Sequence, residues 1–325
     1  MTHRPLASVS LDVDNLWSYM KIHGDAGWEA RPTYLDAFAP AVLEPLARLR
    51  LGITFFIVGV DAAREENVAA LRSFAAAGHE VGNHSHEHES WLHLYSPEQL
   101  REEIATAEAA IVQATGQRPI GFRGPGFSWS PALLEVLAER EYLYDASTFP
   151  TYLGPVARAY YFRTAKLTPE QRKERKALFG GFAEGFRPVK PYQWRLASGR
   201  TLLEIPVTTM PVVKAPFHLS YLLWLSRYSE AAMTAYLRTA VTLCRLTGTE
   251  PSFLLHPLDI LGGDLAPPLR FFPGMDLPTT RKVRLFEKVL RILGEHFELA
   301  NMSTHARAIL RRQALPQREP RLAVS

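Results

Sequence analysis

The sequence predicts an α/β fold in which parallel strands form a closed, barrel-like sheet covered by outer helices. Short apolar runs, typical of buried strands, alternate with longer helical patterns over residues 6–148. No glycine-rich dinucleotide-binding loop follows the first strand, which favours a barrel over an open doubly wound sheet. With 325 residues, of which 47% are hydrophobic, the chain is large enough to bury the core of such a fold.

The individual elements follow from local patterns. Strands are expected where short apolar or β-branched runs end in polar residues or glycine, at 6–14, 53–59, 79–84, 120–126, 143–148, 201–208 and 252–260. Helices are expected where apolar residues recur with helical spacing, at 32–51, 64–78, 96–116, 130–142, 216–248 and 280–297. For the helix at 96–116, Ser96 can cap the first turn, Pro97 suits the first helical position and Gly116 ends it.

Residues 151–200 interrupt the alternation of strands and helices. They mix aromatic residues, a charged segment and Gly/Pro turns. Because loops of this length rarely lack a purpose, we expect an insertion or lid over about 151–200 that frames a site. Residues 1–310 would then form one domain, followed by a basic tail at 311–325 that we expect to be flexible. The alternative for the tail is a weak attraction to an anionic surface.

The composition limits where the protein works and what it binds. A net charge of +4, without a visible basic and aromatic face, does not predict nucleic-acid binding. No run approaches 18 apolar residues, and the N-terminus lacks the apolar segment of a secretory signal. The one cysteine, Cys244, excludes an intramolecular disulfide and lies in an apolar helical pattern, where a buried side chain is expected rather than a nucleophile. We therefore expect a cytoplasmic protein.

The first strand ends in two acids. Asp12 and Asp14 flank Val13 in SLDVD, so both carboxylates face one side of the strand. Neighbouring carboxylates repel each other unless a cation lies between them or one of them is a general base. The carboxyl ends of parallel strands are also where active sites collect. The alternative is a pair of ordinary polar residues at a strand end.

In GHEVGNHSHEH, three histidines lie within five consecutive positions, namely His84, His86 and His88. His84 and His88 are four positions apart, so a helical turn here would place both on one face, whereas His86 would point elsewhere. With Asp14 they would offer a metal two nitrogens and one oxygen and leave positions open for water and substrate. A catalytic acid/base cluster and an accidental polar turn are the competing interpretations; the spacing favours metal binding.

Two further residues fit the same site. Arg123 follows a predicted strand in GFRGPG, and its guanidinium could orient Asp12. His256 ends the apolar run FLLHP, a position that suits a general acid. A surface arginine beside a turn and a satisfied core histidine are the alternatives.

In sequence order, SLDVD, GHEVGNHSHEH, GFRGPGFSWSPALLEVLAEREYLYDAST and FLLHP resemble the motifs of the polysaccharide deacetylase family, also known as the NodB-homology or carbohydrate esterase family. The resemblance covers about 7–150 and returns at 201–260. Its specific part is GHEVGNHSHEH followed by GFRGPG. It implies a distorted (β/α) barrel with fewer than eight strands, in agreement with the alternation of elements.

The resemblance also implies a role for each matching residue in the hydrolysis of an N-acyl bond. Asp12 would be the general base, Arg123 would orient it, and His256 would protonate the leaving amine. The metal ligands would be Asp14, His84 and His88. The ion would be zinc, with cobalt, nickel, manganese or iron as alternatives, and it would polarise the amide carbonyl.

Other positions are less directly carried over from the family. The backbone N–H of Gly126, after Pro125, would help to hold the oxyanion. The Asp-Trp motif that commonly supports the catalytic histidine is not evident, so Glu204 or Asp259 could take its place. The segment 151–200 has no counterpart in compact members.

The resemblance predicts a carbohydrate N-deacetylase that removes an N-acetyl or N-formyl group from an amino sugar. The chain is also similar to the branch that acts on sugars carried by polyprenyl phosphate, and a nucleotide-linked sugar is an alternative. An apolar aromatic stretch at 212–229 could contact a bilayer or a lipid carrier at the inner face of the membrane, although a core helix would have the same pattern. Basic residues that could favour a phosphate are Lys166, Arg172, Lys173, Arg175 and Lys176.

Two other functions remain open at this point. One is a small-molecule amidohydrolase on the same fold. The other is a non-catalytic carbohydrate- or metal-binding relative, which would be expected to have lost Asp12 or His256. Both residues are present.

Overall fold

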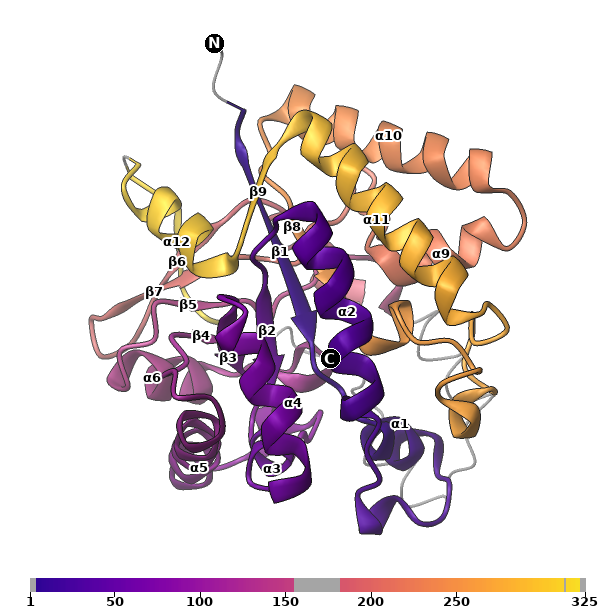
Figure 1. Cartoon of the computed structure of the whole chain (residues 1–325). Coiled ribbons are helices and arrows are strands. Elements are labelled where there is room, and N and C mark those ends of the chain that lie inside the picture. The colour runs from indigo at the N-terminus through magenta and orange to yellow at the C-terminus, as the bar shows by residue number, and fades with distance from the viewer. Residues whose placement is uncertain (1–3, 155–181, 313, 322–325) are drawn as a thin grey trace.

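The computed structural model describes residues 4–154, 182–312 and 314–321, and these form an α/β fold around one mostly parallel sheet (Figure 1). The sheet order is β10-β6-β7-β5-β4-β3-β2-β1-β8, and β9 also pairs with β1. Only β6 and β7 are antiparallel among the described pairs. The strands are β1 (Leu6–Asp12), β2 (Thr54–Ile57), β3 (Glu80–Asn83), β4 (Gly121–Phe122), β5 (Tyr144–Asp145), β6 (Tyr192–Arg195), β7 (Thr201–Glu204), β8 (Ser252–Leu255), β9 (Glu298–Ala300) and β10 (Gln317–Arg318).

The longer helices surround the sheet, and successive ones contact each other along its outer side (Figure 1). The α-helices are α1 (Leu16–His23), α2 (Leu35–Leu49), α3 (Gly59–Ala62), α4 (Glu65–Ala76), α5 (Pro97–Thr115), α6 (Pro131–Glu139), α9 (Leu219–Ser226), α10 (Glu230–Thr247), α11 (Thr279–His296) and α12 (Met302–Leu310). Short 3₁₀ turns are η1 (Trp28–Ala30), η2 (Leu92–Leu94), η3 (Pro125–Phe127), η5 (Phe182–Phe186), η6 (Pro257–Asp259) and η7 (Pro267–Leu269). The main core lies between the sheet and these helices, where for example Phe55 of β2 stacks on Phe74 of α4 with ring centroids 4.1 Å apart.

The sheet approaches a closed barrel. The ladder of described strands runs from β10 to β8 without a strand pair that joins its ends. However, the chain after β7 reaches β8, because the backbone N–H of Thr208 donates to the carbonyl of Ser252 at 3.0 Å. The backbone N–H of Ser252 in turn donates to the hydroxyl of Thr208 at 2.8 Å. The predicted barrel-type α/β fold is confirmed, and these contacts explain how a short, irregular set of strands curls toward closure.

The sequence predicted helix boundaries correctly where capping residues are present. Ser96 and Gln99 form a capping box at the start of α5, and Gly116 ends the helix in a left-handed conformation with φ of 76°. The single helix expected at 216–248 is wrong, because the chain breaks into α9 and α10. Ser229, three residues after the end of α9, caps the new helix α10 by accepting a hydrogen bond from the backbone N–H of Ala232.

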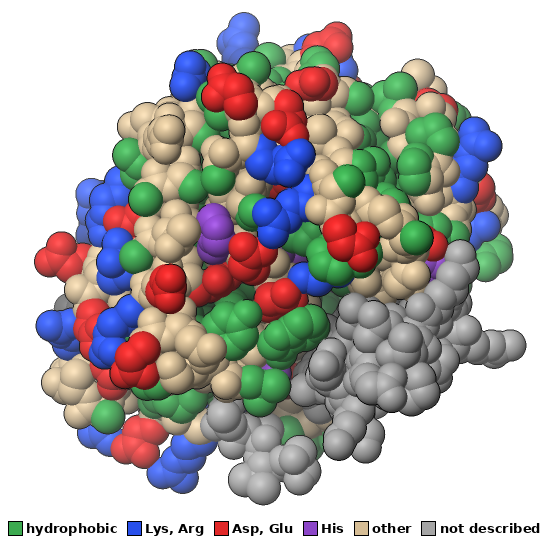
Figure 2. Space-filling model, turned by 90° about the horizontal axis from the view of Figure 1, so that it is seen from below, with side chains coloured by type: hydrophobic (Ala, Val, Ile, Leu, Met, Phe, Trp, Pro, Cys, Tyr) green, Lys and Arg blue, Asp and Glu red, His purple; other side chains and the backbone are tan. Residues whose placement is uncertain are grey.

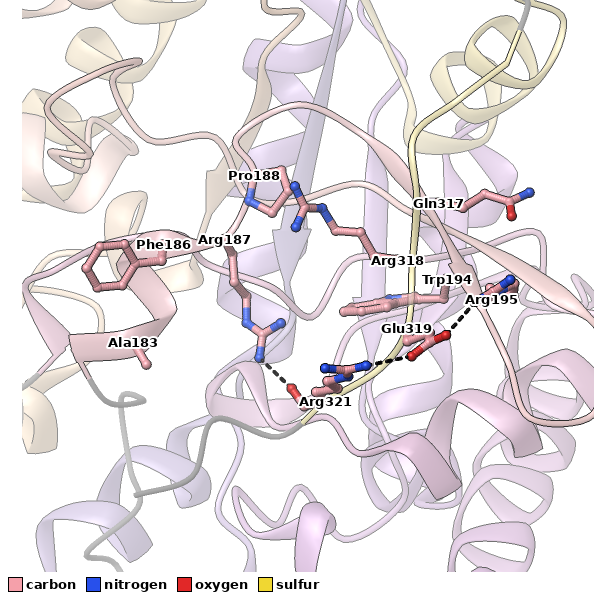
Figure 3. Close-up of a pocket in the computed structure, with 10 residues that line it drawn as sticks. All are labelled: Ala183, Phe186, Arg187, Pro188, Trp194, Arg195, Gln317, Arg318, Glu319 and Arg321. Carbon is pink, nitrogen blue, oxygen red and sulfur yellow. Dashed lines mark hydrogen bonds and ion pairs between the residues drawn. The ribbon is translucent and has the colours of Figure 1, made fainter.

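Part of the C-terminal tail, whose flexibility stays a prediction, pairs with the sheet. Strand β10 pairs in parallel with β6 at the edge of the sheet. Arg195 of β6 forms an ion pair with Glu319 that joins the tail to the sheet, and Arg321 pairs with the same carboxylate within the tail. Beside it lies a cavity of about 740 Å³ (Figure 3). It is lined by Ala183, Phe186, Arg187, Pro188, Trp194, Arg195, Gln317, Arg318, Glu319 and Arg321.

The expected insertion at 151–200 falls partly outside the described residues, since 155–181 are not included. Its later part belongs to the sheet as β6, and the division into one domain and a lid stays a prediction. Across the described parts of the chain, no helix has the length and apolar character needed to cross a membrane. Cys244 is fully buried, and burial raises the pKa of its thiol to about 12, which confirms that it is a core residue.

Candidate active site

The sequence-predicted site residues lie at the carboxyl ends of neighbouring strands. Asp12 ends β1, His84 follows β3, Arg123 follows β4 and His256 follows β8. In the sheet these strands stand in the order β4-β3-β2-β1-β8, so their ends meet along one edge. Figure 2 looks onto this side of the molecule, where acidic, basic and hydrophobic side chains are interspersed in the described part. The sheet order therefore brings together residues that are up to 244 positions apart, from Asp12 to His256.

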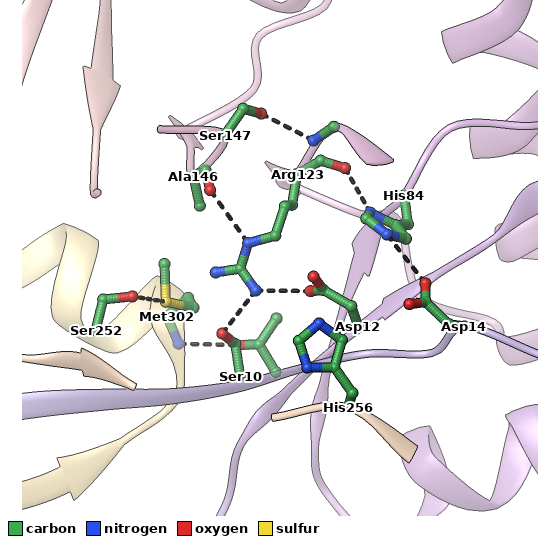
Figure 4. A network of polar contacts seen from close by, with 12 residues as sticks. Ser10, Asp12, Asp14, His84, Arg123, Ala146, Ser147, Ser252, His256 and Met302 are labelled. Carbon is green, nitrogen blue, oxygen red and sulfur yellow. Dashed lines mark hydrogen bonds and ion pairs between the residues drawn. The ribbon is translucent and has the colours of Figure 1, made fainter. Parts of the chain in front are cut away.

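Three of these side chains form a cluster with the spacing of a metal site. Ligand atoms of Asp14, His84 and His88 lie within 4.8 Å of one another. Asp14 Oδ1 is 2.8 Å from His88 Nε2 and 3.4 Å from His84 Nε2. The Nδ1 atom of His84 lies 2.6 Å from the carbonyl oxygen of Arg123, which fixes the ring with Nε2 toward Asp14 (Figure 4). Such a hydrogen bond on the far nitrogen is typical of metal-binding histidines.

The histidine pair converges through loop geometry and not through the helical turn that the spacing suggested. Residues 84–88 are not helical, and Ser85 and His88 have positive φ values of 63° and 56°. The loop is anchored by Glu103 of α5, which accepts hydrogen bonds at 2.8 Å from the backbone N–H groups of His86 and Glu87. The interpretation of His86 agrees with this geometry, since His86 lies outside the cluster.

The charges of the cluster are strongly coupled to one another. Burial raises the pKa of Asp14, but the charges of His88 and His84 and their hydrogen bonds outweigh it and hold that pKa well below its usual range. Burial lowers the pKa of His84, and the carboxylates of Asp12 and Asp14 together with the carbonyl of Arg123 more than reverse this effect. Two imidazoles and one carboxylate thus bring three potential ligand atoms to one point. This donor set fits zinc or a related divalent ion with positions left for other ligands.

Arg123 is the most buried charge of the site. It has no exposed surface, and Asp12 is 4% exposed. Its Nη1 donates to Asp12 Oδ1 at 2.6 Å and to Ser10 Oγ at 2.9 Å, while Nε donates to the carbonyl of Ala146 at 3.1 Å (Figure 4). Among the described residues, Asp12 Oδ2 makes no hydrogen bond. The arginine therefore fixes the carboxylate and leaves one oxygen available to accept a proton.

His256 stands beside these acids and is held by the turn η6. Its backbone N–H donates to Asp259 Oδ2 at 2.9 Å, and its Nδ1 lies 3.8 Å from the same oxygen. Burial lowers the pKa of His256, but the hydrogen bond and charge of Asp259, with the charges of Asp12 and Asp14, raise it to about 9. A histidine in this environment carries a proton at neutral pH, as a general acid must.

The two carboxylates considered as supports for His256 lie in different places. Asp259 contacts His256, as described above. Glu204 instead accepts hydrogen bonds from Thr148, at 2.6 Å from the hydroxyl, and from the indole of Trp194 at 3.0 Å. Burial, together with the charge of and hydrogen bond with Asp145, raises the pKa of Glu204 well above its usual value. The structure thus places Asp259, and not Glu204, next to His256.

The turn η3 places the expected oxyanion donor at the same edge. Gly126, after Pro125, is exposed and has a positive φ of 58°, a conformation suited to glycine. The N–H of Gly126 makes no hydrogen bond within the described part of the chain, so it is free for a ligand. Ser147, which no sequence pattern indicated, supports the turn because its hydroxyl accepts a hydrogen bond from the backbone N–H of Gly124 at 2.8 Å. Its own hydroxyl donates to Asp145 at 2.5 Å.

A second group of unpredicted residues lies behind the metal ligands. Asp61, in α3, accepts hydrogen bonds at 2.9 Å from the side chains of Asn15 and Trp17. Asn15 is the neighbour of Asp14 in the chain, and the Trp17 ring meets the His88 ring edge-on at 6.1 Å. Burial raises the pKa of Asp61 to about 6. An acid directly after the apolar run ITFFIVGV is the signal that could have identified this support.

Comparison with known proteins agrees with the motifs. The sequence model of the family described as polysaccharide deacetylase matches residues 22–144. A chitooligosaccharide deacetylase from Bradyrhizobium sp. (strain ANU 289) is 34% identical over 101 residues, which are 31% of this chain and 45% of that protein. The chain spans less than half the length of the curated relatives that it matches first.

Two solved structures share the fold over nearly the whole chain. A candidate polysaccharide deacetylase from Mycobacterium smegmatis has a TM-score of 0.63 at 18% identity, with 100% of this chain and 96% of that chain covered. PuuE allantoinase has a TM-score of 0.57 at 17% identity, with coverage of 94% and 90%. At these identities the likeness concerns the fold.

The fold is an α/β barrel of the type seen in these structures, and Asp14, His84 and His88 form a candidate metal site at the carboxyl edge of its sheet. The predicted resemblance to the polysaccharide deacetylase (NodB-homology) family is confirmed over residues 22–144, the part that the sequence model of the family matches.

Proposed function

We propose that the protein is a metal-dependent carbohydrate N-deacetylase, which hydrolyses an N-acetyl or N-formyl group from an amino sugar. One observation carries the proposal: a candidate metal centre, an arginine-bound carboxylate and a histidine held by Asp259 lie at the same edge of the sheet. Amide hydrolysis needs these three functions, namely an electrophile, a base for water and an acid for the leaving nitrogen.

Each residue has a distinct part in this reaction. Asp12 accepts the proton of the attacking water through Oδ2, while Arg123 holds Oδ1. His256 donates its proton to the leaving nitrogen and is recharged from solvent or from Asp12. The N–H of Gly126 donates to the oxygen that becomes negative. A divalent ion, for which we propose zinc on Asp14, His84 and His88, supplies Lewis acidity toward water and the acyl oxygen.

We propose further that the amino sugar is linked to a carrier through phosphate. The basic residues expected to favour a phosphate, at 166–176, lie outside the described residues. Support comes instead from the cavity in Figure 3, where four arginines and one glutamate gather. Arg318 has no carboxylate partner among the described residues and faces the ring of Tyr192 at 5.9 Å. The cavity adjoins the active-site turn through Arg187, one of its lining residues. The Cζ atom of Arg187 lies 4.3 Å from the ring centroid of Trp129, and Trp129 follows the end of η3 by two residues.

A lipid carrier would also explain apolar surface near α9. The helix buries Leu222 and Leu223, as a core helix would, but Trp224 is 47% exposed and Tyr228 is 74% exposed. In the preceding loop Val212 is 80% exposed. We propose peripheral contact of this segment with a membrane. Val212→Asp should then reduce co-sedimentation with phosphatidylglycerol vesicles, whereas Leu246→Asp, at a 78% exposed position of α10, should not.

The decisive experiment measures acetate and formate release by metal-stripped and zinc-loaded protein. The substrates would be chitotetraose, nucleotide-linked and polyprenyl-phosphate-linked N-acyl amino sugars, with allantoin as the probe for a small-molecule amidohydrolase. Asp12→Asn should lower turnover by a factor of at least about 10² while zinc stays bound. Asp36→Asn, at an exposed position of α2, is the control. Zinc binding without acyl release from any substrate would refute the enzymatic function and indicate a binding protein instead.

A further inference from the structure

His218 lies in the wall of the active site, although nothing in its sequence context marks it as functional. It is the residue before α9. Its ring centroid is 5.5 Å from that of Phe149, 4.8 Å from that of Tyr221 and 6.0 Å from that of His256. Phe149 in turn stacks on Phe127 of η3 at 4.9 Å. His218 therefore occupies the wall between the oxyanion turn and the general acid.

The polar atoms of His218 have no partners in the described protein. The side chain is 7% exposed, and Nδ1 is buried without a hydrogen bond. Nε2 makes none either and, unlike Nδ1, retains accessible surface. Native proteins rarely leave buried polar groups unpaired, because each one costs free energy, so an unpaired imidazole beside a catalytic group indicates a missing ligand.

The surroundings also keep this imidazole uncharged. Burial lowers the pKa of His218 to about 3, and the positive charges of His256 and Arg123 act in the same direction, against Asp259. A neutral ring presents one N–H and one lone pair. It can bind a hydroxyl without placing a second cation beside the protonated His256.

We propose that His218 contacts the substrate and hydrogen-bonds a hydroxyl of the amino sugar on the side of the leaving nitrogen. The side is set by His256, which donates to that nitrogen and lies next to His218. Phe149 and Tyr221 supply the apolar walls that frame a few polar contacts in ligand sites. This assignment rests on the proposed deacetylase function and extends it to the recognition of the sugar.

The test compares His218→Phe with His218→Gln in the zinc-loaded full chain, with chitotetraose as substrate. Loss of one hydrogen bond made in both ground and transition states raises KM and leaves kcat nearly unchanged. We expect KM to rise about tenfold in His218→Phe, with kcat within about threefold, and to recover in part in His218→Gln. Zinc content should not change. His79→Gln is the matched control, because His79 is also buried but lies before β3, at the opposite edge of the sheet.

Two results would overturn the assignment: an unchanged KM in His218→Phe, or a glutamine variant no better than the phenylalanine variant, which would indicate a space-filling role. If the wild type releases neither acetate nor formate from any of the substrates named above, the deacetylase proposal fails, and His218 can still be judged by saturation-transfer NMR of glucosamine with the zinc-loaded protein. Equal signals from wild type and His218→Phe would then refute sugar recognition. A signal lost in His218→Phe and kept in His218→Gln would support it.

Discussion

Replacing Arg123 by methionine should destabilise the protein strongly, because it leaves Asp12 in the core without its counter-charge. Both side chains are almost inaccessible, at 0% and 6% exposure, so solvent cannot screen the loss. The variant also removes the donors to Ser10 and to the carbonyl of Ala146. Breaking one side of a buried ion pair costs about 3–5 kcal/mol. For a chain of 325 residues that corresponds to a fall in Tm of roughly 4–7 °C.

The double variant Asp12→Asn/Arg123→Met separates the ion pair from simple packing. Asp12→Asn alone leaves a buried guanidinium uncompensated, and Arg123→Met alone leaves a buried carboxylate. Removing both charges removes both penalties, so the double variant should be more stable than the sum of the single effects by about 1.5–3 kcal/mol. Urea unfolding followed by circular dichroism gives the four free energies. Additivity within about 0.5 kcal/mol, or a cost of Arg123→Met below about 1 kcal/mol, would refute the reasoning.

Three further predictions concern the metal centre, the acid and a buried lysine. Elemental analysis should find about one divalent ion per chain that is lost in His84→Ala and kept in His86→Ala; equal metal content in both would remove the proposed ligand set. Asp259→Asn should lower kcat by about 10–100-fold, while Glu204→Gln should leave kcat within about threefold, and the reverse order would make Glu204 the support of His256. Burial lowers the pKa of Lys282 to about 8, so the unfolded chain binds the extra proton between pH 8 and 10.5 and stability rises with pH in that window. The free energy of unfolding of wild type relative to Lys282→Met should increase by about 3 kcal/mol from pH 7 to pH 10.5, as measured by urea unfolding, and a flat difference would contradict this.

The parts of the fold that could be predicted are those controlled by local chemistry. The helix at Pro97–Thr115 carries its own start and stop signals, so its ends follow from Ser96 and Gly116. The break between α9 and α10 could not be predicted with equal ease, because apolar residues continue across it and only Ser229 marks the new start. The order of strands in the sheet is not a local property at all. It depends on long-range contacts such as that between Thr208 and Ser252.

In the candidate site, too, the sequence indicated which residues matter better than how the fold places them. Acids and histidines after apolar runs identified Asp14, His84 and His88, and the structure brings their ligand atoms together. The spacing of four suggested a helical turn that would place His84 and His88 on one face. In the structure the two rings converge because Ser85 and His88 adopt left-handed backbone conformations, which spacing cannot reveal. The unpredicted His218 and Ser147 carry no motif, since their importance arises from what the fold places beside them.

Arg123, at the end of β4, contacts both the proposed base and a proposed metal ligand. Its guanidinium holds Asp12, the proposed base, and its carbonyl oxygen orients His84, a proposed metal ligand. The carbonyl contact does not require the arginine side chain, whereas the ion pair does. A substitution at this position therefore acts on the base directly and on the metal ligand only through movement of β4. The short strand β4 is held on one side by β3 and on the other by β5, and the side-chain bond of Arg123 to the carbonyl of Ala146 ties it to the segment after β5. The position of the proposed base relative to the proposed metal ligand His84 is thus fixed by the strand pairs of β4 and by the buried guanidinium of Arg123.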